Sequence, residues 1–320
     1  MKILVLNSAI KQEHRSRIME ITSKYGAVVC FAESEDDVPS EFKSPDVIYG
    51  FGVKTARECK DLKWLCVPSA GVDYLMKPGC FANEDCILTN SSGSYGVTIA
   101  EHIIAVTLMM MRGLTSYYAG SLRGEWVTSH CPQKSLKDAR ITVLGTGDIG
   151  CSFARRARAF EPARLIGVSR SGVCSDPSFD EMYKISSLDE LLSVTDLLVM
   201  SLPSTPEITD ILNAARIELL PQGAYVVNVG RGSAIDEDAL VSALENGKLG
   251  GAALDVFKTE PLPADSPLWK VPNLLITPHV AGNLTLDYTL EKNVDMFCED
   301  LVNFLEGRSL KYVVDRKKGY

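Results

Sequence analysis

The 320-residue sequence lacks a long apolar run and any excess of basic residues. No uninterrupted apolar stretch approaches the ~20 residues that cross a bilayer as a helix, so we expect no membrane partner. Thirty-three Lys and Arg residues stand against 41 Asp and Glu residues, which gives a formal net charge of -8. With no local basic cluster to overcome that field, the composition also disfavours nucleic acid as a partner.

The nine cysteines include no Cys-x-x-Cys pair, and no histidine stands at zinc-ligand spacing from them. An odd, scattered set of this kind is typical of reduced thiols in the cytoplasm rather than of a disulfide framework or a zinc site. The first apolar run ends at Asn7, which makes it too short for the apolar core of a signal peptide. We therefore expect a cytoplasmic protein without a bound metal.

What the sequence does contain is a repeated alternation of short apolar runs and polar, helix-like stretches. At ~150 residues per domain the length predicts about two domains, and the alternation predicts an α/β protein with two doubly wound parallel sheets in tandem. We place one domain at residues 1–97 and 285–320 and the other at 98–284. The predicted strands are 3–6, 27–31, 47–49, 64–67 and 87–89 in the first domain, and 141–144, 165–168, 197–200, 225–229, 252–255 and 274–277 in the second.

Two longer stretches connect these series. Residues 98–112 are helix-like and are followed by an irregular stretch at 120–137. A second amphipathic helix is predicted after His279, with Gly307 as its C-terminal stop. Together with the short apolar run 312–314, that helix would return the chain to the first domain. Its apolar face consists of Leu286, Leu290, Val294, Phe297, Leu301 and Phe304.

A glycine-rich turn directly follows the predicted strand 141–144. Gly145 permits a tight turn, Gly147 lets the backbone approach a pyrophosphate, and Gly150 lets the following helix pack closely on the strand. Because a strand precedes the glycines and a helix and another strand follow them, the pattern predicts a dinucleotide-binding site. The alternative is a tight strand-to-helix turn without a ligand.

The next strand ends in Ser169-Arg170-Ser171, about 20 residues beyond the fingerprint. Sites for NAD usually offer Asp or Glu to the ribose hydroxyls there. A carboxylate would repel a 2′-phosphate, whereas Arg pairs with it and a hydroxyl donates to it. We therefore predict a preference for NADP(H) over NAD(H); the alternative is an exposed Arg170 that stacks on adenine and tolerates either cofactor.

Three charged residues follow three further predicted strands: Arg231, Glu260 and His279. Each alone is weak, since an arginine after a strand is usually solvated and a single histidine is often structural. Together they match the reduction of a 2-keto acid. Arg231 would bind the substrate carboxylate and polarise the carbonyl, His279 would donate a proton to the developing alkoxide, and Glu260 would orient the imidazole.

The other three histidines have no comparable neighbours in the sequence. His14 lies in the first helix-like segment and His130 in the irregular stretch. His102 follows Glu101 in the middle of the 98–112 helix, which we interpret as packing at an inter-domain or subunit face.

In the first domain, a candidate substrate-binding segment follows the strand 64–67. Backbone N–H groups of Ala70, Gly71 and Val72, at the start of a helix, would receive the substrate carboxylate; the alternative is a plain turn. Three aromatic residues are candidates for shaping the pocket: Tyr49, Phe51 and Tyr95.

Six segments in order resemble the D-isomer-specific 2-hydroxyacid dehydrogenase family over essentially the whole chain. They are Ser-Ala-Gly71-Val-Asp73, Val-Leu-Gly-Thr-Gly-Asp-Ile-Gly150, Leu202-Pro203-Ser-Thr-Pro-Glu, Asn228-Val-Gly-Arg231-Gly, Ala-Leu-Asp255-Val-Phe and Thr-Pro-His279-Val-Ala-Gly. The resemblance implies a flavodoxin-like substrate domain and a Rossmann cofactor domain, with the active site in the cleft between them. It assigns Arg231, Glu260 and His279 the roles given above.

The resemblance also implies further cofactor contacts, with Asp255 on the nicotinamide amide. These contacts are Asp148, Ile149, Leu202, Pro203, Thr209, Val229, Gly230 and Asp255. It further implies a homodimer joined through the cofactor domains, with the 98–112 helix and the stretch after it contributing.

Within the family, Val-Ser-Arg170-Ser and the terminal Val-Asp-Arg-Lys-Lys-Gly-Tyr320 look most like the glyoxylate/hydroxypyruvate reductase branch. We expect a reductase that makes a D-2-hydroxy acid such as glycolate or D-glycerate. Two alternatives stay open. One is an NAD-linked member acting on a bulkier keto acid or on 3-phosphoglycerate, and the other is a dinucleotide-sensing scaffold similar to the corepressors of this family.

Overall fold

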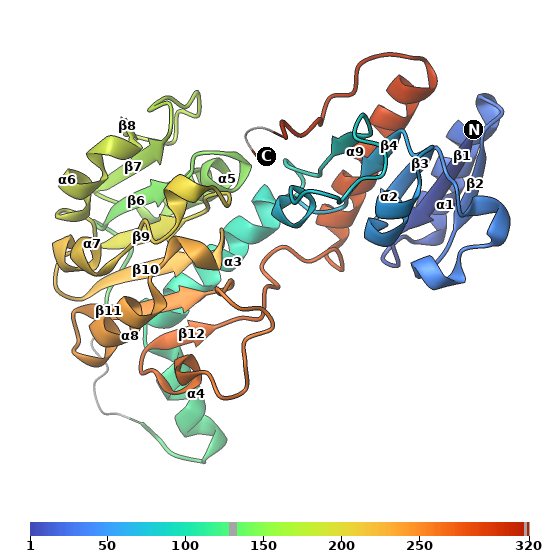
Figure 1. Ribbon diagram of the computed structural model, residues 1–320. Coiled ribbons are helices and arrows are strands. Elements are labelled where there is room, and N and C mark those ends of the chain that lie inside the picture. The colour runs from blue at the N-terminus through green and yellow to red at the C-terminus, as the bar shows by residue number, and fades with distance from the viewer. Residues whose placement is uncertain (128–132, 317–318, 320) are drawn as a thin grey trace. The chain divides into compact units, whose positions relative to one another are not determined.

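The computed structural model describes residues 1–127, 133–316 and 319, so His130 and Cys131 lie outside the described residues, as do Lys317, Lys318 and Tyr320. The chain divides into two compact units (Figure 1). Unit 1 comprises Met1–Tyr95 and Asn283–Tyr320, and unit 2 comprises Gly96–Gly282. Both divisions lie two residues before the domain boundaries that we placed from the sequence.

Unit 1 is built on a five-stranded sheet in the order β2-β1-β3-β4-β5, in which every pair is parallel. This is the flavodoxin-like strand order. The strands are β1 (Lys2–Leu6), β2 (Val28–Phe31), β3 (Val47–Gly50), β4 (Trp64–Cys66) and β5 (Ile87–Thr89), and the helices are α1 (Gln12–Lys24), α2 (Val53–Glu58) and α9 (Asp287–Leu305).

The C-terminal helix α9 completes the core of unit 1 (Figure 1). Five of the six residues of its predicted apolar face pack against β1, β3 and β4, while Leu286, which precedes the helix, is exposed. The ring of Phe297 stacks on Tyr49 with centroids 4.0 Å apart. The Tyr49 hydroxyl donates to Asn293 Oδ1 at 2.6 Å. Tyr49 is therefore a fully buried core residue of unit 1, and the expectation that it shapes a substrate pocket is wrong.

Unit 2 is built on a seven-stranded parallel sheet in the order β12-β11-β10-β9-β6-β7-β8. The chain order reverses between β6 and β9, as in Rossmann folds, where ligands bind at this switch point. The strands are β6 (Arg140–Leu144), β7 (Arg164–Ser169), β8 (Glu181–Lys184), β9 (Leu197–Met200), β10 (Ala224–Asn228), β11 (Leu249–Leu254) and β12 (Leu274–Ile276).

Helices cover both faces of this sheet (Figure 1). On one face α3 contacts α5 and the strands β10 and β11, and on the other α6, α7 and α8 adjoin one another. The helices are α3 (Gly96–Met111), α4 (Leu114–Leu122), α5 (Asp148–Ala157), α6 (Leu188–Leu192), α7 (Ala214–Leu219) and α8 (Glu237–Glu245). Short 3-10 turns lie at Glu35–Asp37, Ser40–Phe42, Asp73–Leu75, Arg158–Phe160, Ile185–Ser187, Pro206–Ile208, Gly232–Ala234 and Pro267–Lys270.

The predicted α/β class with two parallel sheets is confirmed, while two details differ from expectation. The strand β8 was not predicted, because it is a partly exposed edge strand with charged residues at both ends and no apolar run. The helix α4, after Gly113 at φ 62°, was not predicted, and only its last three residues enter the stretch 120–137 that was expected to be irregular. The run 312–314 returns to unit 1 as expected, through a single antiparallel bridge between Val313 and Thr89.

Among the described residues, no single helix has the length and apolarity to cross a bilayer. The pair α3 and α4 meets those two criteria when taken together, but its members bend by 74° at the break between them.

Candidate active site

The loops that carry the predicted site residues leave the sheet of unit 2 at one edge. Parallel pairing aligns the last residues of five neighbouring strands in a single row, and each of these strands leads into a segment with predicted functional residues. The row consists of Leu144, Met200, Asn228, Leu254 and Ile276. The structure therefore gathers on one edge groups that lie more than 130 residues apart in sequence.

Glycine is required for different reasons at two of the three fingerprint positions, and at the third no contact in the described part of the chain requires it. Gly145 has φ +96°, and a Cβ there would lie 2.7 Å from the Ser201 carbonyl oxygen. A Cβ at Gly150 would lie 2.0 Å from the Gly145 carbonyl oxygen, so α5 packs directly on the turn. At Gly147, the N-cap of α5, a Cβ would meet nothing within 4 Å. No contact among the described residues requires glycine at position 147, which fits a backbone kept bare for an external group.

The N-terminus of α5 also contacts the next helix along the sheet face. The Asp148 carboxylate accepts a hydrogen bond from the Gly96 N–H at 2.7 Å, at the start of α3. This contact gives the Asp148 side chain a structural partner. The predicted cofactor contacts of Asp148 and of its neighbour Ile149 stay predictions.

The loop after β7 places Ser169, Arg170 and Ser171 beside one another, with Arg170 and Ser171 exposed. Ser169 Oγ accepts from the Gly172 N–H at 3.0 Å, which fixes the turn. None of the three positions carries a carboxylate. The loop therefore presents a cation and hydroxyls where an NAD site usually has an acid.

The segments after β9 and β10 pack on each other. A Cβ at Gly230 would lie 2.7 Å from the backbone of Leu202, so glycine is required for that approach. Leu202 and Val229 are buried, Pro203 is partly buried, and Thr209, after the turn Pro206–Ile208, is exposed.

Arg231 follows this close approach and is positioned by a side-chain clamp. Asn228 at the end of β10 donates from Nδ2 to the Arg231 carbonyl at 2.9 Å and accepts from the Gly230 N–H at 3.0 Å. The Arg231 guanidinium donates to the Gly230 carbonyl at 2.8 Å. Asn228 is buried, and sequence reasoning did not single it out as a positioning residue.

His279 and Glu260 form a direct pair. His279 Nδ1 lies 2.7 Å from Glu260 Oε2, and Glu260 Oε1 accepts from the Phe257 N–H at 2.9 Å. The carboxylate is thus anchored at one oxygen and holds the ring with the other. With Nδ1 facing Glu260, Nε2 is the ring nitrogen that can serve a ligand.

The loop of His279 is held from beneath by Asp255, which is only 3% exposed. Asp255 Oδ1 accepts from Thr277 Oγ1 at 2.6 Å and from the Val280 N–H at 2.9 Å, and Oδ2 accepts from the Ala281 N–H at 3.0 Å. His279 itself has φ +54°, a costly conformation for a residue with a side chain. These hydrogen bonds on both sides of it stabilise that conformation. The predicted contact of Asp255 with the nicotinamide stays a prediction beside this structural role.

His102 extends the same network. Its Nε2 lies 3.3 Å from Thr277 Oγ1, and burial lowers its pKa, although the nearby Asp255 carboxylate acts in the opposite direction. We predicted that His102 packs at an inter-domain or subunit face, and that prediction missed its contact with the loop of His279. In the sequence, only the hydroxyl of Thr277, two residues before His279, could have indicated a polar partner in that loop.

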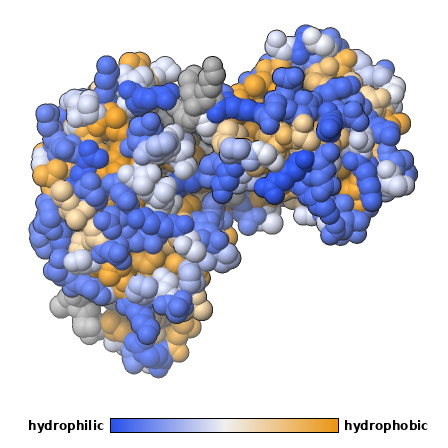
Figure 2. All heavy atoms as spheres, viewed as in Figure 1, coloured by the Kyte–Doolittle hydropathy of each residue, from blue (hydrophilic) through white to orange (hydrophobic). Residues whose placement is uncertain are grey.

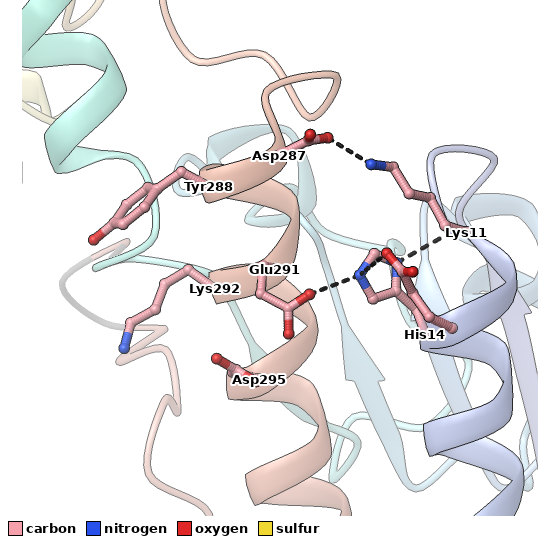
Figure 3. A pocket seen from close by; sticks show the side chains of 8 residues that line it. Lys11, His14, Asp287, Tyr288, Glu291, Lys292 and Asp295 are labelled. Carbon is pink, nitrogen blue, oxygen red and sulfur yellow. Dashed lines mark hydrogen bonds and ion pairs between the residues drawn. The ribbon is translucent and has the colours of Figure 1, made fainter.

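A second histidine and glutamate pair lies in unit 1, beside a pocket of about 420 Å³ between α1 and α9 (Figure 3). His14 Nε2 lies 2.8 Å from Glu291 Oε2, and its Nδ1 accepts from the Lys11 N–H at 3.2 Å. Both ring nitrogens are occupied, and the His14 side chain is 4% exposed against 54% for His279. The statement that His14 has no comparable neighbour is therefore wrong, because Glu291 is 277 residues away in sequence. Only His279 of these two combines a carboxylate partner with an open ring.

The segment Ala70, Gly71 and Val72 in unit 1 precedes one 3-10 turn, Asp73–Leu75, rather than an α-helix. The Val72 side chain is buried in the core, and the carbonyls of Ala70 and Gly71 accept from Asn90 and Ser69. The expectation of a helix start is corrected to a short turn, so no helix dipole supports anion binding there. Its contact with substrate, like the placement of the active site between the domains, stays a prediction.

Comparisons with known proteins agree with this geometry. The sequence model for "D-isomer specific 2-hydroxyacid dehydrogenase, NAD binding domain" matches residues 104–281. A relative from Corynebacterium melassecola, described as an uncharacterized protein in the proB 3′ region, is 34% identical over 271 residues, covering 80% of this chain and 86% of the relative.

Solved structures are similar over nearly the whole chain. A D-isomer specific 2-hydroxyacid dehydrogenase family protein from Aeromonas salmonicida is 32% identical with a TM-score of 0.85, covering 98% of this chain and 99% of that one. An NADPH-dependent glyoxylate/hydroxypyruvate reductase from Sinorhizobium meliloti, in complex with NADP and sulfate, is 27% identical with a TM-score of 0.82, covering 100% and 99%.

Proposed function

Because this chain belongs to the D-isomer specific 2-hydroxyacid dehydrogenase family and is thus an NAD(P)-dependent oxidoreductase, we propose that it reduces a small 2-keto acid with NADPH. The substrate is of the glyoxylate or hydroxypyruvate type and the product is the D-2-hydroxy acid. The observation that carries this proposal is the His279–Glu260 pair, 2.7 Å apart, on the sheet edge that also bears Arg231 and the glycine fingerprint.

The residues after β6 and β7 fit a dinucleotide. The open backbone at Gly147 and the N-terminus of α5 suit a pyrophosphate, while the segments at Leu202–Pro203 and Val229–Gly230 adjoin the switch point. When bound, the nicotinamide of the cofactor supplies the hydride. The remaining chemistry falls to side chains of this chain.

His279 is the proposed proton donor. Glu260 holds Nδ1 of the ring, which fixes the ring plane and leaves Nε2 to face the substrate. The proton on Nε2 then passes to the carbonyl oxygen of the substrate as that oxygen gains negative charge. In the oxidative direction the neutral ring takes the proton back.

Arg231 is the proposed anchor for the substrate carboxylate. A guanidinium binds a carboxylate through two parallel N–H donors, which orients a 2-keto acid and polarises its carbonyl. The Asn228 clamp fixes the backbone on both sides of Arg231 and so limits the movement of its side chain.

The preference for NADPH is supported by the loop Ser169, Arg170 and Ser171. A 2′-phosphate carries close to two negative charges, which Arg170 pairs with and the hydroxyls of Ser169 and Ser171 donate to. The NADP complex of the similar reductase from Sinorhizobium meliloti agrees with this cofactor choice.

The test is a matrix of initial rates. Glyoxylate, hydroxypyruvate, pyruvate and longer 2-keto acids are each measured with NADPH and with NADH. We expect the largest kcat/KM with NADPH and a two- or three-carbon keto acid. A preference for NADH with a bulky keto acid would favour the NAD-linked alternative. Cofactor binding without turnover of any keto acid would favour the sensing scaffold.

We also propose a homodimer formed through unit 2. The helix α4 exposes Leu114, Tyr118 and Leu122, and Trp126, four residues beyond its end, is 93% exposed. Apolar surface is visible at the lower end of the molecule where α4 lies (Figures 1 and 2), and contiguous exposed apolar side chains mark interaction sites. A Trp126→Glu variant that sediments as a monomer, against a dimeric wild type, would support the proposal. The cytoplasmic location stays a prediction from the sequence.

A further inference from the structure

Two cysteines meet where the phosphate-binding turn and the loop after β7 come together. Cys151 lies in the first turn of α5, and Cys174 follows β7. Their sulfurs are 3.4 Å apart, and both are free thiols. Each thiol also reaches the Thr146 carbonyl inside the fingerprint, Cys151 at 3.2 Å and Cys174 at 3.8 Å.

The loop that carries Cys174 is already fastened to α5. Arg155 Nε donates to Asp176 Oδ2 at 2.7 Å, and the Asp176 side chain is 8% exposed. The Asp176 N–H in turn lies 3.4 Å from Cys174 Sγ. These contacts hold the two sulfurs together, so a bond between them requires a closing movement of only about 1.4 Å, to the ~2.05 Å of a disulfide.

We propose that Cys151 and Cys174 are a redox modification site, which a peroxide oxidises to a disulfide that weakens NADPH binding. The effect on the cofactor rests on the proposed function, whereas the formation of the bond does not. Neither cysteine takes part in the hydride or proton transfer.

The two thiols have different roles in the proposed oxidation, because they differ in exposure. Cys174 is partly exposed and Cys151 is buried, and burial, before the effect of the neighbouring Cys174, raises the pKa of Cys151 to about 12. Cys174 is therefore the thiol that meets the oxidant. Its sulfur attacks one peroxide oxygen and the O–O bond breaks. The other oxygen departs as water with the thiol proton, and Cys174 becomes a sulfenic acid. The Cys151 sulfur then attacks that sulfur, the S–S bond forms, and a second water leaves.

Oxidation acts on the cofactor site through the loop after β7. Arg170 and Ser171 lie four and three residues before Cys174, and a disulfide would tie that loop covalently to α5 in a shifted position. It would also remove both S–H donors from the Thr146 carbonyl. The 2′-phosphate is the part of NADPH that meets this loop, so NADH should be affected much less.

The experiment treats the full-length enzyme with excess hydrogen peroxide, followed by removal of the oxidant. Mass spectrometry of the digested, alkylated protein should show a peptide that links Cys151 to Cys174. The KM for NADPH should rise about tenfold, the scale of one lost charge-assisted hydrogen bond, with little change in the KM for NADH. A dithiol reductant should restore both the thiols and the KM.

Three variants complete the test. Cys151→Ser and Cys174→Ser should each abolish the link and the peroxide effect on KM, while Cys30→Ser, which removes a partly buried thiol of unit 1, should retain both. Absence of the linked peptide in the wild type would overturn the site. A complete link with an unchanged KM for NADPH would overturn its control of the cofactor. An enzyme that used only NADH would overturn the cofactor proposal instead, and the linked peptide would still decide the thiol site.

Discussion

Replacing Glu260 with Gln removes the negative charge beside His279 and preserves the shape of the side chain. The carboxylate joins His279 Nδ1 at 2.7 Å to the Phe257 N–H at 2.9 Å. A hydrogen bond to a charged group contributes about 1.5–3 kcal/mol. Because the side chains of His279 and Glu260 are 54% and 35% exposed, water screens the pair and the lower end applies. A loss of about 1.4 kcal/mol in stabilisation of the transition state corresponds to a tenfold lower kcat.

The assay is the initial rate of glyoxylate reduction at saturating NADPH. Glu291→Gln is the matched control, since it alters the buried His14 pair at a similar distance of 2.8 Å and should leave kcat unchanged. Equal kcat values for Glu260→Gln and wild type would refute the role of Glu260.

Three further predictions address the cofactor site and the buried network. Arg170→Asp should raise the KM for NADPH about tenfold or more through charge repulsion, and an unaltered ratio of NADPH to NADH use in initial rates would contradict this. Gly147→Ala should weaken cofactor binding, measured by fluorescence titration, and leave the Tm unchanged. Gly150→Ala should lower the Tm, because its Cβ would lie 2.0 Å from a carbonyl oxygen. Equal losses of Tm in the two variants would count against a bare backbone at Gly147. Burial lowers the pKa of His102 in the folded state, so its contribution to stability is full above the unfolded pKa of about 6.5 and declines as the pH falls below it. His102→Gln should therefore lose less Tm than wild type between pH 7 and pH 5, and parallel melting profiles would show that His102 does not titrate this way.

The elements that the sequence predicted share one property, an apolar run or an apolar face of regular period. The central strands of both sheets and the buried face of α9 are of this kind. The strand β8 has no such run, because it carries charged residues at both ends, whereas the edge strands β2 and β12 have apolar runs and were predicted. The helix α4 was missed because its apolar residues face outward, so they do not form the pattern of a helix packed on its own core.

The candidate site was predictable where chemistry and strand ends coincide. Arg231, Glu260 and His279 each follow a predicted strand, and parallel pairing brings those strand ends to one edge. The supporting contacts were not predictable, because they join residues far apart in sequence. The contact between His102 and Thr277 spans 175 residues and that between His14 and Glu291 spans 277.

The structural role of Asp255 was also not predictable from the sequence. Resemblance alone implies a contact with the cofactor, whereas the geometry shows its carboxylate holding Thr277, Val280 and Ala281 around the left-handed His279. Such a role depends on backbone N–H groups, which every residue carries and which leave no signature in a sequence.

The most direct measurement is the turnover of His279→Ala with NADPH and glyoxylate, made beside a titration of NADPH binding. A proton donor in this position predicts a kcat lower by about 10² or more, with the dissociation constant for NADPH unchanged. A variant that bound NADPH normally and retained near wild-type kcat would contradict the account and place the proton donor elsewhere.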